Sequence, residues 1–161
     1  MSGDIFEDLP LFRDLAPEQI QLLRPIFMLC DCYLGTNLFE QGDPAEYLYL
    51  VAEGEVTIRY KPDDGPAIVI ARIRPGGVVG WSAALGNRFY TSAAVCSDSA
   101  QLVRVRARDL RRLYELYPDT GILILDRLAS VIAERLLHTH DQVMALLMHG
   151  MRAGELSIKE V

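Results

Sequence analysis

The hydrophobic and polar positions of this chain follow a helical period at its two ends and an alternating period between them. Near the N-terminus, Leu15, Ile20 and Leu23 recur at the spacing of one helix face. Pro17 suits the first turn of that helix, and Pro25 ends it. The first regular element is therefore predicted to be a short amphipathic helix.

The central part of the chain, from about residue 26 to residue 106, has the pattern of short strands and turns. Residues 26–33 look extended, and in residues 56–60 Val, Ile and Tyr alternate with Thr and Arg. The Gly- and Pro-containing segments 61–66 and 74–77 are typical of turns between strands. Many short strands with turns at regular spacing predict a mainly β domain, either a sandwich, a barrel or a jelly roll.

After Arg106 the period becomes helical again. A short amphipathic helix is predicted over residues 109–117, and Pro118 ends it. A long helix then follows over residues 119–148, which is 30 residues or roughly 45 Å in length. Its apolar stripe contains Leu125, Leu128, Ile132, Leu136 and Val143.

This long helix is longer than a small β domain needs to cover its own face. We therefore expect its stripe to pair with the same helix of a second subunit, although packing back on its own domain is the alternative. The chain is divided accordingly into a β unit with its flanking helices (1–118), a dimerisation helix (119–148) and a loose tail (149–161).

Composition and charge exclude several classes of protein. The chain has 161 residues, half of them hydrophobic, which fits one globular domain with a sizeable core. Its net charge of −6 does not favour nucleic acid or an anionic membrane surface. Because the N-terminus lacks a secretory signal and no apolar run could span a bilayer, we expect a cytoplasmic protein. The arginine-rich segment 104–112 is interpreted as a solvated face, with a basic patch for an acidic partner as the alternative.

Cysteine and histidine give no sign of a metal site or a nucleophile. Cys30 and Cys32 would lie on one face of a strand, where two small buried hydrophobes are favoured over half a metal site or a redox pair. His138 and His140 are two residues apart on a helix, so they point in different directions. We therefore predict no catalytic residue and no metal ligand. An enzyme of the cupin type needs several converging ligands, so that alternative is weak.

Three stretches in a fixed order carry a family resemblance: LFRDLAPEQIQLL at 11–23, GTNLFEQGDPAEYLYLVAEGEVTI at 35–58 and RPGGVVG at 74–80. Together they resemble the cyclic nucleotide-binding domain family, which includes the catabolite-activator transcription factors and the regulatory subunits of cyclic-nucleotide-dependent kinases. The resemblance implies an eight-stranded β-roll (a double-stranded β-helix, or jelly roll), with helices before it and a long helix after it that often forms a dimer interface. Glycines 35, 42 and 54 of the motif fall where sharp turns favour a positive φ.

In this family a cassette after the sixth strand holds the cyclic phosphate. It begins Phe-Gly-Glu, continues as a short helix and ends Arg-x-Ala. The amides at the start of the short helix meet the phosphate, the arginine adds a charge-assisted contact, and the glutamate accepts a hydrogen bond from the ribose. In this chain the first three positions are Val79, Gly80 and Trp81. The short-helix positions begin with Ser82 and Ala83.

The arginine position of the cassette falls at Thr91, or at Tyr90 if the loop is one residue shorter, and Ser92 fits the next position. Neither anchoring side chain of the family is therefore present, which should weaken nucleotide binding by roughly 10²–10⁴-fold. Arg88 lies two or three residues early, where it is either a solvated loop residue or, through a shifted loop, a replacement for the missing arginine.

The favoured hypothesis is a non-enzymatic bacterial-type regulatory module, dimeric through its long helix, in which ordinary binding of cyclic AMP or cyclic GMP is weakened or lost. It would respond to another small ligand or act through a protein partner. The alternative is a genuine cyclic-nucleotide receptor that uses Arg88. Only about a dozen residues follow Met148, so no helix-turn-helix domain and no direct DNA binding are expected.

Overall fold

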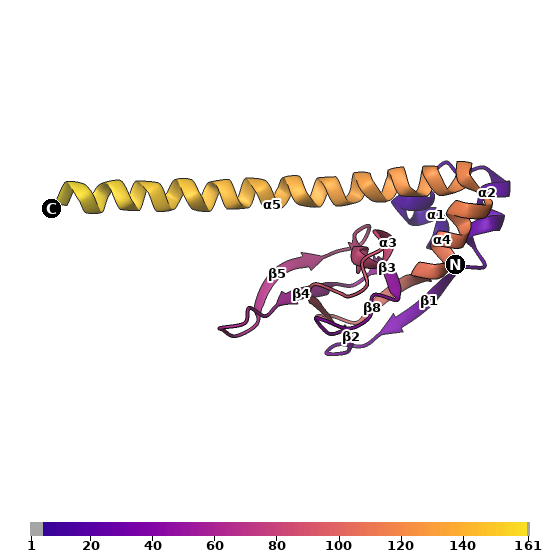
Figure 1. Cartoon of the computed structure of the whole chain (residues 1–161), viewed down its shortest axis with the longest axis horizontal. Coiled ribbons are helices and arrows are strands. Elements are labelled where there is room, and N and C mark those ends of the chain that lie inside the picture. The colour runs from indigo at the N-terminus through magenta and orange to yellow at the C-terminus, as the bar shows by residue number, and fades with distance from the viewer. Residues whose placement is uncertain (1–4, 161) are drawn as a thin grey trace.

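The computed structural model describes residues 5–160, except for the side chains of residues 136, 138–140, 142–143, 146 and 149–160. Eight strands and six helical segments make up this part of the chain (Figure 1). In chain order they are α1 (Ile5–Asp8), η1 (Pro10–Phe12), α2 (Pro17–Leu23), β1 (Phe27–Cys32), β2 (Asn37–Phe39), β3 (Tyr47–Glu53), β4 (Val56–Tyr60), β5 (Ile68–Ile73), β6 (Val78–Val79), α3 (Trp81–Ala84), β7 (Ala93–Cys96), β8 (Ala100–Arg106), α4 (Ala107–Leu116) and α5 (Pro118–Glu160).

The strands form two four-stranded antiparallel sheets, with the orders β1-β8-β3-β6 and β2-β7-β4-β5. Consecutive strands change sheet repeatedly, as in a jelly roll, so the β-roll predicted from the sequence is confirmed. Helices α1, α2 and α4 gather at one end of the roll, while α5 extends far past it on the side that carries α3 (Figure 1).

Strand β3 explains how two cores share one sheet. Leu48 and Leu50 are buried in a helix-side core, against α2, α4 and the start of α5, whereas Tyr49 and Val51 are buried in a roll core between the two sheets. A strand that buries both faces reads as a nearly continuous hydrophobic run, which is what the segment YLYLV shows.

Gly54, in the turn between β3 and β4, is required by both conformation and space. Its φ is +83°, and a Cβ added there would lie 2.3 Å from the carbonyl oxygen of Ser99. Gly35 and Gly42 also have positive φ angles, 85° and 90°, so the turns predicted at these three glycines are confirmed.

Helix α5 differs from the prediction in its length and in the side that it buries. It begins at Pro118 and continues to Glu160, so it is 43 residues long rather than ending at Met148 before a loose tail. Leu128, predicted for the dimer stripe, is only 2% exposed because it packs with Ile124 into the helix-side core of its own chain. This correction has a simple cause: the first turns of α5 cover the end of the β-roll.

The other residues of the predicted dimer stripe differ in their exposure. Leu125 is 36% exposed, and Ile132 is partly buried. The side chains of Leu136 and Val143 lie outside the described residues. No described helix is both long enough and apolar enough to cross a membrane.

Candidate functional site

The cassette begins with a sharp change of direction at Gly80. Strand β6 ends at Val79, Gly80 takes a left-handed conformation with φ 78°, and α3 starts at Trp81. A Cβ at Gly80 would lie 2.9 Å from the carbonyl oxygen of Tyr47 and 3.2 Å from a ring carbon of Tyr90. Glycine is therefore needed here for its backbone conformation and for the close approach of β3.

Tyr90 occupies the inside of the roll beside this turn. It is 5% exposed, and its ring stacks on Phe39 with a centroid separation of 3.6 Å and an interplanar angle of 11°. Its hydroxyl donates to the carbonyl oxygen of Tyr47 at 2.6 Å and accepts from the Tyr47 amide at 2.9 Å. Burial raises the pKa of Tyr90, so the phenol stays neutral at physiological pH. The Tyr90 side chain is thus fixed by the stacking of its ring and by the hydrogen bonds of its hydroxyl.

The space left next to the cassette is very small. A cavity of about 10 Å³ remains, and the cassette residues that line it are Gly80, Trp81, Ser82, Tyr90, Thr91 and Ser92. Phe39, Ile58 and Arg135 complete its lining. A cavity needs roughly 10–15 Å³ to hold one water molecule, and pockets for small organic ligands are about 300–1,000 Å³. Six of the eight predicted cassette residues therefore meet around a site that is closed.

Trp81 does not close this site by itself. It is partly buried against the helix-side core, and the Arg135 guanidinium lies 5.7 Å from the centroid of its ring. Arg135 comes from α5 and is half-buried, which lowers its pKa. Beside the cassette, Tyr90 and Phe39 fill the inside of the roll, whereas the Trp81–Arg135 pair joins the cassette to α5.

The other two predicted cassette residues, Ala83 and Arg88, do not line the cavity. Ala83 is buried, and its amide already donates to the carbonyl oxygen of Gly80 at 3.0 Å. Arg88 is exposed, and its carbonyl accepts from the Ala45 amide at 2.9 Å. In this structure the Arg88 loop is held to the segment before β3, on the outside of the roll.

Sequence reasoning missed three residues of the site: Phe39, Ile58 and Arg135. Phe39 belongs to the motif that carries the resemblance, and alternation in residues 56–60 could have placed Ile58 inside the roll. Arg135 lies about 50 residues after the cassette on α5, and no local pattern indicates that it returns to Trp81.

The cysteines occupy the positions expected of buried hydrophobes. Cys30 is partly buried, Cys32 and Cys96 are buried, and all three thiols are free. Burial, together with the neighbouring Cys32 thiol, raises the pKa of Cys96 to about 12, so this thiol is not a nucleophile near neutral pH. Among the residues with described positions, no group of three or more His, Cys, Asp or Glu could hold a metal ion. The side chains of His138, His140 and His149 lie outside the described set.

Comparisons with known proteins agree with the fold. Residues 33–117 match the family model of the cyclic nucleotide-binding domain. The Cyclic AMP receptor protein of Thermus thermophilus is 31% identical over 127 residues, which cover 79% of this chain and 57% of that protein. The cAMP-activated global transcriptional regulator CRP of Salmonella typhimurium is 28% identical over 67% of this chain and 50% of its own length. This chain therefore spans about half the length of the curated relatives it matches.

Among solved structures, a cyclic nucleotide-binding domain from Methylobacillus flagellatus has the same fold. It superposes with a TM-score of 0.76 over 88% of this chain and 79% of that one, at 22% sequence identity.

Proposed function

The chain belongs to the cyclic nucleotide-binding domain family, and we propose that it is a non-enzymatic regulatory module in which ordinary binding of cyclic AMP and cyclic GMP is lost. Its matched relatives are regulators. The observation that carries the proposal is Tyr90, which stacks on Phe39 and fills the roll beside the cassette. A nucleotide could enter only after this side chain had moved.

Two independent effects act against the nucleotide. The first is the absence of the glutamate and the arginine that anchor it in the family, which lowers affinity by roughly 10²–10⁴-fold. The second is the displacement of Tyr90, which breaks two hydrogen bonds to the backbone of Tyr47. Because the apparent affinity falls with the fraction of molecules that are open, the second effect multiplies the first.

The module is proposed to be a cytoplasmic homodimer that uses α5. Four large apolar side chains between residues 137 and 148 of this helix are exposed on their own chain: Leu137 (64%), Met144 (44%), Leu147 (56%) and Met148 (51%). Leu137, Met144 and Met148 are separated by seven and four residues, so they lie on one side of the helix, away from the side buried by Leu128. Pairing this side with a second copy would bury apolar area that is exposed in a single chain.

The output of the dimer is proposed to be contact with a protein partner. The net charge of −6 disfavours nucleic acid as the direct partner of this part of the chain. An enzymatic role has no support from the described residues, since neither an activated nucleophile nor a cluster of metal ligands is found among them.

Titration calorimetry with cyclic AMP and cyclic GMP tests the lost binding. We expect no saturable heat at ligand concentrations up to the millimolar range. Micromolar binding by the parent protein would contradict the proposal. If that binding disappeared in Arg88→Ala but not in Arg108→Ala, an exposed arginine on α4, the chain would instead be a receptor that uses Arg88.

A further inference from the structure

A large cleft of the described structure lies beside the cassette, on the other side of Trp81 from the small cavity. It has a volume of about 740 Å³ and runs between α5, the segment that follows η1 and the turn between β5 and β6. Trp81 forms part of its wall on one side, together with Ile132 of α5. This volume is within the range of sites for small organic molecules, about 300–1,000 Å³. The cleft therefore offers the room that the inside of the roll lacks.

The cleft is positively charged although the chain is acidic. Its lining contains five arginines, at positions 13, 72, 74, 127 and 135, and two carboxylates, Asp14 and Glu134. The local formal charge is thus +3, whereas the whole chain carries −6. A concave site of one sign attracts ligands of the opposite sign.

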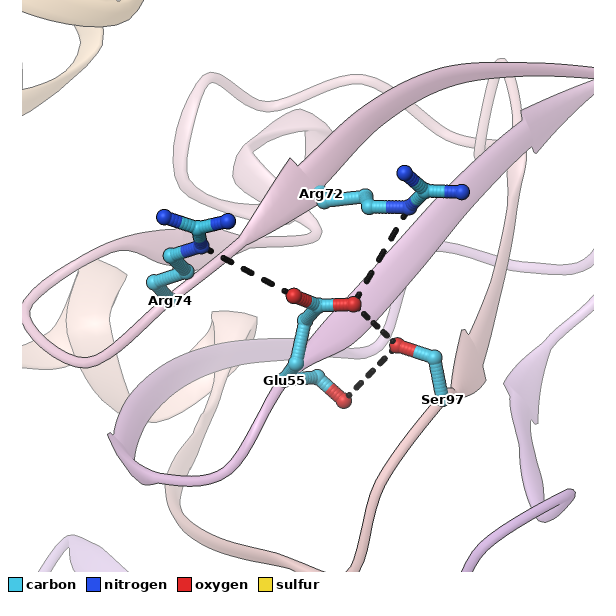
Figure 2. A network of polar contacts seen from close by, with 4 residues as sticks. All are labelled: Glu55, Arg72, Arg74 and Ser97. Atoms are coloured by element: carbon cyan, nitrogen blue, oxygen red, sulfur yellow. Dashed lines mark hydrogen bonds and ion pairs between the residues drawn. The ribbon is translucent and has the colours of Figure 1, made fainter.

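Two of these arginines are oriented as a pair. Arg72 of β5 and Arg74 contact opposite oxygens of Glu55 through their Nε atoms, at 4.0 Å and 3.7 Å. Glu55 is itself fixed because the Ser97 hydroxyl donates to its carboxylate at 2.9 Å. Figure 2 shows that the terminal nitrogens of both guanidinium groups lie on the side away from this carboxylate. Two guanidinium groups that contact one carboxylate through Nε and direct their terminal nitrogens away from it suit a ligand with more than one anionic group.

The other arginines connect the cleft to α5. Arg127 donates to the backbone carbonyl oxygens of Leu11 and Arg13, so its charge is held where α5 crosses the N-terminal segment. Arg135 lies against the ring of Trp81 and lines both this cleft and the small cavity of the cassette. A ligand in the cleft would contact α5 and the roll together.

We propose that this cleft binds a small organic or inorganic polyanion, in which phosphate or carboxylate groups are held by Arg72 and Arg74. This inference rests on the proposed function in one respect: the polyanion is taken to be the ligand to which a module without ordinary nucleotide binding responds. By bridging α5 and the roll, the bound anion would favour the arrangement in which α5 packs on the β5–β6 turn.

The single tryptophan of the chain provides the assay, because Trp81 lies in the wall of the cleft. Its fluorescence would be titrated with pyrophosphate and, separately, with citrate, at an ionic strength of about 0.15 M so that weak surface attraction is screened. We expect a saturable change with at least one of them. A response to pyrophosphate alone identifies a phosphate site, a response to citrate alone a carboxylate site, and a response to both a site that recognises charge.

Two variants with opposite expected effects make the assignment specific. Arg72→Gln with Arg74→Gln should weaken binding by about tenfold, because two charge-assisted contacts at an exposed site are lost. Glu55→Gln should tighten binding by about two- to fivefold, because it removes a competing negative charge. The matched control is Arg108→Gln with Arg111→Gln, which removes the same charge from exposed positions on α4.

The proposal is overturned if neither anion gives a saturable change, or if the control pair weakens binding as much as the Arg72/Arg74 pair does. The two proposals fail separately. If neither pyrophosphate nor citrate changes the fluorescence of Trp81, only the proposal that the cleft binds an anion is contradicted. Cyclic AMP binding that persists in the Arg72/Arg74 variant contradicts the proposed function alone.

Discussion

Replacement of Tyr90 by phenylalanine isolates the hydroxyl that fixes this side chain in the roll. The ring remains, so the stack on Phe39 is kept and no cavity is created. What is lost is the pair of hydrogen bonds to the amide and the carbonyl oxygen of Tyr47. Those two backbone groups lie in a partly buried region, where neither finds an equivalent partner.

An unsatisfied buried polar group costs about 1–3 kcal/mol. Because Tyr47 is only partly buried, the lower half of that range applies to each group, and the total loss should be about 2–4 kcal/mol. For a chain of this size, 1 kcal/mol corresponds to roughly 2–4 °C in Tm, so the expected decrease is roughly 4–16 °C. Urea unfolding and thermal unfolding followed by circular dichroism measure the two quantities.

Tyr33→Phe is the control, since that side chain is 75% exposed and its substitution should change stability by less than about 0.5 kcal/mol. The difference between the parent and Tyr90→Phe should also depend on pH. Burial raises the pKa of Tyr90 in the folded state, so its stabilisation is fully present below the unfolded pKa of 10.0 and is lost as the pH rises above it. A Tyr90→Phe protein as stable as the parent at pH 7 would refute the reasoning.

Three further substitutions test other parts of the structure. Gly54→Ala should destabilise the protein by about 2–4 kcal/mol in urea unfolding, because its Cβ would meet backbone atoms. Gly42→Ala has the same positive φ but nothing within 4 Å, so it should cost only about 1 kcal/mol, and equal losses would contradict the steric argument. Tyr114→Phe should lose less stability than the parent between pH 10 and 12, because burial raises the pKa of Tyr114 from 10.0 to about 12; an unchanged slope would contradict this. Met144→Glu should yield monomers in sedimentation whereas Ala145→Glu, on another side of α5, should not; a monomeric parent would exclude the dimer.

Much of the fold could be predicted from the sequence because its signals are local. Alternation in residues 56–60 and glycines at sharp turns such as Gly54 depend on immediate neighbours in the chain. The strand and the turn are confirmed, but burial along the strand does not alternate, because Thr57 is buried and Tyr60 is exposed. The order of the glycine motifs along the chain then predicted the β-roll through the family resemblance. The sharp turn at Gly80 and the short helix that begins at Trp81 are local features of the same kind.

The features that could not be predicted depend on distant contacts. The stripe on α5 indicates that Leu128 is buried, but not whether its own domain or a second chain covers it. The sequence offers Tyr90 either as a cassette position or as a side chain that lines or fills the pocket, and the choice depends on contacts with Phe39 and Tyr47, which lie more than 40 residues away. The pairing of Arg72 and Arg74 around Glu55 likewise requires β4 and β5 to be in register.

The proposed loss of nucleotide binding is tested most directly by the thermal unfolding of the protein with and without cyclic AMP. A ligand present at 100 times its Kd stabilises the folded state by about 2.7 kcal/mol, which for this chain corresponds to roughly 5–10 °C. With Tyr90 in the roll, we predict that about 1 mM cyclic AMP leaves the Tm unchanged within about 1 °C. An increase of 5 °C or more, retained after Arg72 and Arg74 are replaced by glutamine, would contradict the account.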